Sequence, residues 1–129
     1  MAKLSNLVNV NINRNVIKIQ DVEIPVIFTF KSFPHLEDAY GKPYHIFEKD
    51  LNRMMKKGRV ELGRNETKLI FALIYAMVRS GGTDCTVHEL EGAIPLQDLP
   101  GVFEVILPIF QNQIFQVSDS KKINSQKKR

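Results

Sequence analysis

The most apolar part of the chain is LIFALIYAMV, residues 69–78, which has no polar face along a helix. Asn65 precedes it as a candidate N-cap and Gly81 and Gly82 follow it, so the pattern predicts a helix over residues 66–79. A helix that is apolar all round must be covered on every side. Because a chain of 129 residues has few elements to spare, we expect contacts with a second subunit to supply part of that cover.

Two further helices are predicted on the C-terminal side of this segment. Thr86 and Glu89 have the spacing of a capping box, in which both side chains accept hydrogen bonds from free amides at a helix start. Asp98 is the expected cap of the last helix, which is apolar around most of its circumference over residues 102–110. Pro108 lies inside that helix and lacks an amide hydrogen, so we expect a kink or a break there.

The N-terminal part of the chain has the patterns of β-strands. Valine and isoleucine alternate with asparagine over residues 8–13, and residues 13–15 fit a hairpin turn. Residues 16–19 and 22–30 predict two further strands. Pro25 in the last of them favours an edge position or a bulge.

Helical signals fill the region between these strands and the apolar segment. Ser32 is a candidate N-cap and Gly41 a stop for a short helix over residues 35–40. Pro43 opens a second helix, which Gly58 ends. The apolar stripe of that second helix consists of Phe47, Leu51, Met54 and Met55.

Strands followed by helices indicate an α+β domain instead of alternating βαβ units. We expect a small N-terminal antiparallel β-sheet or hairpin followed by a bundle of four to five α-helices. A single domain is predicted over residues 1–118, with strands at about 7–31 and helices at about 33–115. Residues 119–129 are basic and contain almost nothing apolar, so we predict a disordered tail.

The charge of the chain is unevenly distributed. The formal net charge is +4, and it arises in the tail, because residues 1–118 contain equal numbers of bases and acids. Residues 53–79 are basic, whereas residues 80–118 contain five acids and no lysine or arginine. Either the two segments face each other within the domain, or they form opposite surfaces that favour head-to-tail self-association. Since the bases of residues 53–68 have no aromatic residues between them and residues 1–118 are neutral overall, we do not expect nucleic acid as the partner.

The sequence contains no recognisable catalytic or metal-binding motif. Asp84, Cys85 and His88 are close together, but Cys85 directly precedes a helix cap and nothing supplies an oxyanion hole. The three histidines and the single cysteine are too widely spaced for a zinc motif, and there is no phosphate loop. We therefore expect no enzymatic activity, no metal and no cofactor.

Cytoplasmic localisation is expected from three features. The longest apolar run is well short of the roughly 20 residues of a membrane span. A single cysteine allows no internal disulfide, and the N-terminal residues lack the pattern of a secretory signal. We therefore expect no contact with a membrane.

The order of these motifs resembles the small tail assembly chaperones of long-tailed bacteriophages and prophages. The resemblance covers about residues 22–115. It is carried by the strand VIFTF at 26–30, LEDAYG at 36–41, the apolar helix with its glycine pair, TVHEL at 86–90 and the apolar last helix. It implies a protein without enzymatic activity that binds the tape measure protein, keeps this long helical chain soluble and assists polymerisation of the tail tube.

Apolar contacts are the expected mode of binding, because a long helical client presents repeated apolar stripes. We draw the candidate partner-binding residues from the two most apolar helices: Leu73, Met77, Phe103, Ile106 and Phe110. The alternative is that these residues belong to the core, where large apolar side chains usually lie. Two other functions stay open, namely another phage structural or connector subunit that forms homo-oligomers, and a small DNA-binding regulator.

Overall fold

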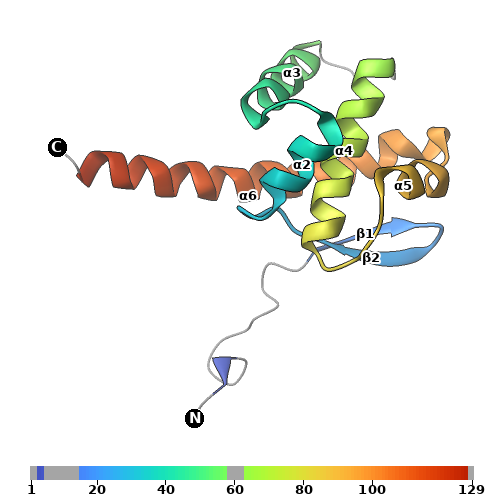
Figure 1. The fold of residues 1–129 in the computed structure, drawn as a ribbon, viewed down its shortest axis with the longest axis horizontal. Helices are drawn as coiled ribbons and strands as arrows, with labels where there is room; N and C mark the ends of the chain where they lie inside the picture. Colours follow the sequence, from blue (N-terminus) through green and yellow to red (C-terminus); the bar gives the residue numbers. More distant parts are fainter. Residues whose placement is uncertain (1–2, 5–14, 58–62, 128–129) are drawn as a thin grey trace.

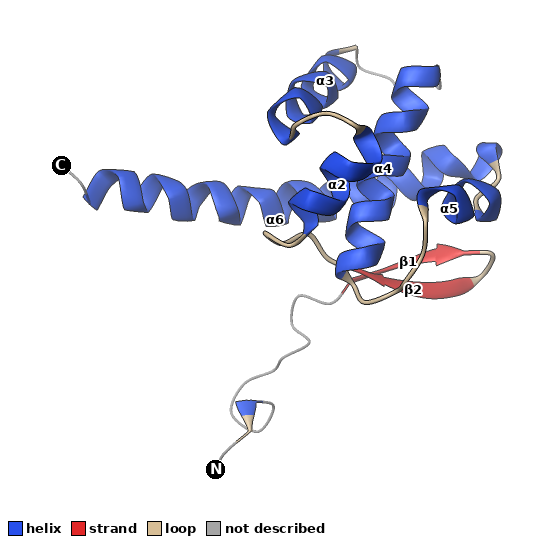
Figure 2. Cartoon of the chain, in the orientation of Figure 1, coloured by secondary structure: helices blue, strands red, loops and turns tan. Residues whose placement is uncertain are grey.

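The computed structural model describes residues 3–4, 15–57 and 63–127, with side chains to residue 114. A two-stranded antiparallel hairpin is followed by a helical bundle, which confirms the predicted α+β class (Figures 1 and 2). The elements are β1 (Asn15–Ile19), β2 (Val22–Val26), α2 (Ser32–Tyr40), α3 (Tyr44–Lys56), α4 (Arg64–Ser80), α5 (Val87–Ala93), the 3-10 turn η1 (Leu96–Asp98) and α6 (Leu99–Lys127).

The hairpin turns at Gln20 and Asp21, which both have the positive φ of a tight two-residue turn. Its two strands confirm the predictions for residues 16–19 and for the start of 22–30. The predicted strand over residues 8–13 lies outside the described residues, and Asn15, predicted in a turn, is the first residue of β1.

The second strand ends at Val26, four residues earlier than predicted. The reason is that the next two amides bond to helices. Ile27 donates its N–H to the carbonyl oxygen of Met77 (3.2 Å), and Phe28 donates its N–H to Oε1 of Gln113 (2.6 Å). The chain after β2 is therefore fixed to α4 and α6 instead of to a neighbouring strand.

Two of the predicted helix starts are wrong by one or more residues. Ser32 is the first residue of α2 and not its cap, and its buried Oγ accepts a hydrogen bond from the N–H of Thr29. Helix α4 begins at Arg64 after Gly63, so Asn65 lies inside the helix. Gly41, which ends α2 with a φ of 77°, and Pro43, which precedes α3, confirm their predictions.

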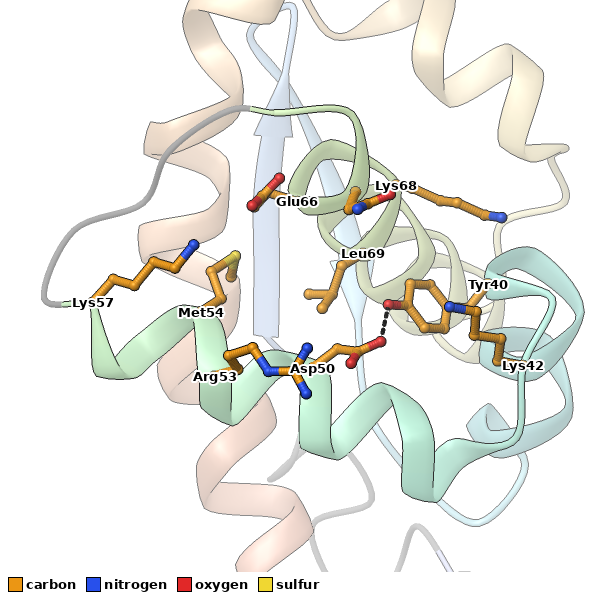
Figure 3. A pocket seen from close by; sticks show the side chains of 10 residues that line it. Tyr40, Lys42, Asp50, Arg53, Met54, Lys57, Glu66, Lys68 and Leu69 are labelled. Carbon is orange, nitrogen blue, oxygen red and sulfur yellow. Dashed lines mark hydrogen bonds between the residues drawn. The ribbon is translucent and has the colours of Figure 1, made fainter.

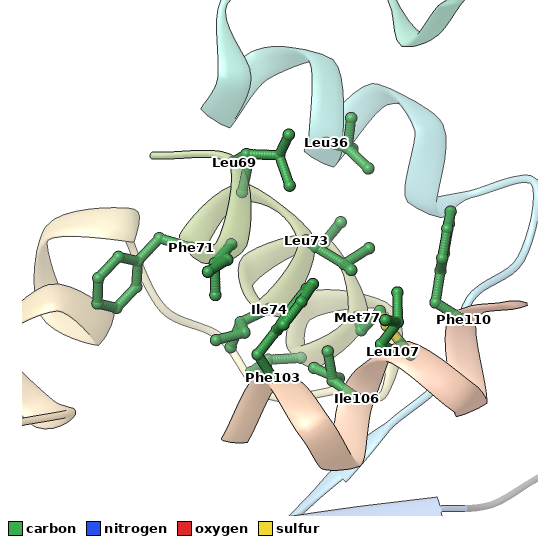
Figure 4. Packing of buried hydrophobic residues seen from close by; sticks show 14 of the residues in the cluster. Leu36, Leu69, Phe71, Leu73, Ile74, Met77, Phe103, Ile106, Leu107 and Phe110 are labelled. Carbon is green, nitrogen blue, oxygen red and sulfur yellow. The ribbon is translucent and has the colours of Figure 1, made fainter. Parts of the chain in front are cut away.

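Helix α4 passes through the centre of the domain (Figure 1). Figure 4 shows it between α2 and α6, with Leu73 directed toward α2 and Met77 toward α6. Helix α5, strand β2 and α3 also contact it. Residues 69–74 and 76–78 are buried within the single chain. The expectation that a second subunit is needed to cover this helix is therefore wrong, because the chain's own elements cover it.

The last helix differs from the prediction at two places. It is one helix across Pro108, because buried side chains on both sides of the proline, Phe103 and Phe110 among them, anchor it to the core. It also continues to Lys127, through residues that were predicted to be a disordered tail. Residues 111–127 contain no proline or glycine, and a helix that is already nucleated extends at little cost. Its C-terminal part projects beyond the other elements (Figure 1).

Candidate functional site

The five residues predicted to bind a partner all lie in the core. Phe110 is the most exposed of them, at 3%, and Leu73, Met77 and Ile106 have no exposed surface. Figure 4 shows these side chains packed between α4 and α6. They therefore form no surface in this conformation. The apolar stripe of α6 faces α4 of the same chain, and the helical period alone cannot distinguish that arrangement from a stripe that faces a partner.

A charged cleft lies between α3 and α4 and is closed by the C-terminal end of α2 (Figure 3). Its volume is about 350 Å³. We call it the basic cleft, because four of its residues are cationic and two are acidic. It is lined by Tyr40, Lys42, Asp50, Arg53, Met54, Lys57, Asn65, Glu66, Lys68 and Leu69.

Tyr40 forms the fixed wall of the basic cleft. The residue is 5% exposed, and its hydroxyl donates a hydrogen bond of 2.6 Å to Oδ2 of Asp50 on α3 (Figure 3). Burial, and then the hydrogen bond to Asp50, raise the pKa of Tyr40 above its ordinary value, so the hydroxyl stays a neutral donor. The Nζ atoms of Lys42 and Lys68 lie 5.7 and 6.0 Å from the ring centroid. This is the range of cation–π attraction, which holds both ammonium groups near the cleft.

The cations of the basic cleft form no ion pair with any acid in the part of the chain that the structure describes. Arg53, Lys57 and Lys68 belong to residues 53–79, which the sequence analysis identified as basic, but that analysis did not find Lys42 or Tyr40. These two come from the end of another helix, and only the packing of α2 against α4 brings them to the site.

The basic and acidic segments pack against each other through apolar side chains of α4, α5 and α6, but few of their charged side chains meet. Within residues 15–57 and 63–114, they are joined by the ion pair of Arg79 with Asp84. The basic cleft uses the first turns of α4, whereas acidic α5 packs near Val78 at the other end of that helix. The charged side chains of the two segments therefore lie mostly on separate surfaces.

An apolar groove of about 310 Å³ lies between the hairpin and α5. Its polar rim includes Gln20, which donates a hydrogen bond of 2.9 Å to the carbonyl oxygen of Ala93. Val22 is 57% exposed at its edge. We call this surface the apolar groove; its apolar lining is Ile19, Val22, Ile24, Val78, Leu90 and Ala93.

Cys85 also lines the apolar groove, but it lacks the features of a nucleophile. Burial is the main cause that raises the pKa of its thiol, and the carboxylates of Glu89 and Asp84 add to the effect while Arg79 opposes it. An activated cysteine requires the opposite shift. Asp84 is bound to Arg79, so it does not orient a base toward the thiol.

The described residues contain no group of three or more His, Cys, Asp or Glu side chains that could hold a metal ion. Among the same residues, no single helix has the length and apolarity of a membrane span. Helix α5 together with residues 96–114 meets that criterion only as a pair bent by 90°.

Comparison with known proteins adds no relative. No protein-family model matches the chain, and no curated protein and no solved structure matches it either.

Proposed function

We propose that this protein is a tail assembly chaperone in the cytoplasm of a bacterial host. It binds a phage tape measure protein, keeps that helical chain soluble and so assists polymerisation of the tail tube. The proposal is supported by the resemblance of residues 22–115 to this family and by an α+β fold of the kind that the motifs predict.

The observation that carries the proposal is the apolar groove. The domain buries most of its large apolar side chains, yet Val22 is exposed between the hairpin and α5, and Ile19 and Ile24 beside it are only half-buried. A helix-forming client offers apolar side chains at every third or fourth position. A groove of about 310 Å³ accommodates a few such side chains at a time. Many weak contacts of this kind would hold a long client without fixing one register.

The polar rim of the groove fits the same role. The Gln20 to Ala93 hydrogen bond joins the hairpin turn to the end of α5, so it links the two walls of the groove. Glu89 stands at the rim, where its side chain already accepts a hydrogen bond from the N–H of Thr86. The rim is therefore preorganised, which reduces the entropy lost on binding.

Co-expression with the tape measure protein of the same phage tests the proposal. With the chaperone present, the client is expected to remain soluble and to co-purify at high salt, because apolar contacts are insensitive to ionic strength. The variant Val22→Lys should lose the client. Its matched control is Val105→Lys, which places the same charge at a valine of similar exposure, 49% against 57%, on α6. A client that stays insoluble with the wild-type protein, or equal loss with both variants, would contradict the proposal.

A further inference from the structure

We propose that the basic cleft binds carboxylate groups, and that its partner is an acidic protein segment with neighbouring Asp or Glu side chains. This inference goes beyond the proposed function, because the basic cleft is separate from the apolar groove and shares no lining residue with it.

The cationic groups come from three elements and meet at one concave site. Arg53 and Lys57 are one helical turn apart on α3, so they lie on the same face. Lys42 follows the end of α2, and Lys68 belongs to the second turn of α4, where its Nζ is near Gly41. Such convergence from separate elements distinguishes the cleft from a row of solvated lysines on one helix.

The electrostatics of the basic cleft favour an anion. Asp50 accepts a hydrogen bond from the Tyr40 hydroxyl. None of the four cations has an ion-pair partner within the described residues. Like charges that converge on one cavity repel each other, and a bound carboxylate relieves this repulsion. The guanidinium of Arg53 can donate two parallel hydrogen bonds to one carboxylate, which provides geometric selectivity as well as charge.

Two features favour an acidic protein segment over nucleic acid. Asp50 and Glu66 line the cleft beside the four cations, so its formal charge is 4 − 2 = +2, which suits one or two carboxylates but provides little attraction for a long phosphate backbone. The ring of Tyr40 is buried, so it offers no face on which a base could stack. A volume of about 350 Å³ matches one or two carboxylate side chains.

Titration of the full chain with a hexaglutamate peptide tests the inference. We expect saturable changes in the amide NMR signals of residues 40–42, 50–57 and 64–69. Arg53→Glu should weaken binding by at least about tenfold, since it removes a charge-assisted contact and adds a repulsive one. Lys31→Glu is the control, because it makes the same charge change at an exposed residue that precedes α2. Tyr40 lies at the other end of this nine-residue helix, about 13 Å away along the axis and beyond the Debye length, so Lys31→Glu should change binding by less than about twofold.

A second variant separates binding from folding. Lys42→Glu lies between helices α2 and α3, so it changes the cleft without altering a helix, and it should weaken peptide binding as Arg53→Glu does. Light scattering of the protein without peptide tests whether the acidic segment belongs to a second copy of this chain. A mass above 14.8 kDa that Arg53→Glu reduces points to the acidic residues of a second copy, and a monomer that binds the peptide points to a different protein.

Three results would overturn the inference. The first is the absence of saturable binding at millimolar peptide. The second is equal weakening by Lys31→Glu and Arg53→Glu, which would mean a response to net charge. The third is duplex DNA that displaces the peptide at physiological salt and loses its own binding in Arg53→Glu, which would assign the cleft to nucleic acid.

Discussion

Gly81 lies where α4 ends against β2. A Cβ atom at this position would overlap the backbone carbonyl of Pro25, and neither the helix end nor the strand can move away without loss of contacts. Its φ of −74° is ordinary, so lack of space and not backbone freedom requires glycine. Gly81→Ala should lower the free energy of unfolding by about 1–3 kcal/mol, the usual cost of overpacking.

Gly92 supplies the control for this change. A Cβ there would meet nothing within 4 Å, and the residue belongs to α5, so Gly92→Ala should leave stability unchanged or raise it by up to about 1 kcal/mol. Urea denaturation of both variants measures the difference. Equal stability of the two variants would mean that α4 and β2 are not in close contact at Gly81.

Gln113 is buried on α6, and its side-chain oxygen accepts the hydrogen bond from Phe28 that helps to end β2. Gln113→Leu keeps the size of the side chain but leaves a buried amide without its acceptor, so stability should fall by about 1–3 kcal/mol. Gln111→Leu, on the exposed side of the same helix, should have little effect. If thermal denaturation gave the same midpoint for both variants, the contact between the chain after β2 and α6 would be in doubt.

These residue contacts were beyond sequence reasoning. Ser32 is hydrogen-bonded to Ser80, Phe28 to Gln113 and Tyr40 to Asp50 on another helix. From the local pattern alone, a serine before a helix is predicted to be a cap. That pattern contains no information on Ser80, the hydrogen-bond partner 48 residues away. Long-range polar contacts depend on how helices pack, which periodicity does not determine.

At the scale of single elements, α5 depends on its N-terminal cap. It has only seven residues, and both hydrogen bonds of the predicted capping box are present, each 3.0 Å long. Thr86→Ala should lower the free energy of unfolding by about 1 kcal/mol, whereas Thr86→Ser keeps the hydroxyl and should be close to neutral. Chemical denaturation compares the two variants, and a loss of stability with serine as large as with alanine would show that the hydroxyl has no capping role.

Local signals predicted where the helices and turns lie better than they predicted what each helix packs against. The capping box, Gly41 and Pro43 act through neighbours in the sequence, so they were recognised. The apolar pattern of residues 69–78 also predicted α4 well. It could not show whether the chain itself or a second subunit covers this helix, because both arrangements require the same apolar surface. For the same reason, the pattern could not show that the five residues predicted to bind a partner lie in the core.

At the scale of the whole molecule, the residues that the structure describes form a closed core, and the apolar groove and the basic cleft on its surface differ in chemistry. The apolar groove lies beside acidic α5, and the basic cleft lies at the opposite end of α4. Helix α4 has 17 residues, which corresponds to about 25 Å between its ends. A charge change at one site should therefore have little influence on the other, because the distance exceeds the Debye length of about 8 Å at physiological salt.

Hydrogen exchange of the chaperone, alone and in complex with the tape measure protein, is the most direct test of the claim that the client binds at the apolar groove. We expect client-induced protection of amides in residues 19–24 and 85–93, with the exchange of α4 and of residues 99–114 unchanged. Faster exchange in α4 and α6 on binding would contradict the account, because it would mean that the core opens and that Leu73, Met77, Phe103, Ile106 and Phe110 meet the client directly.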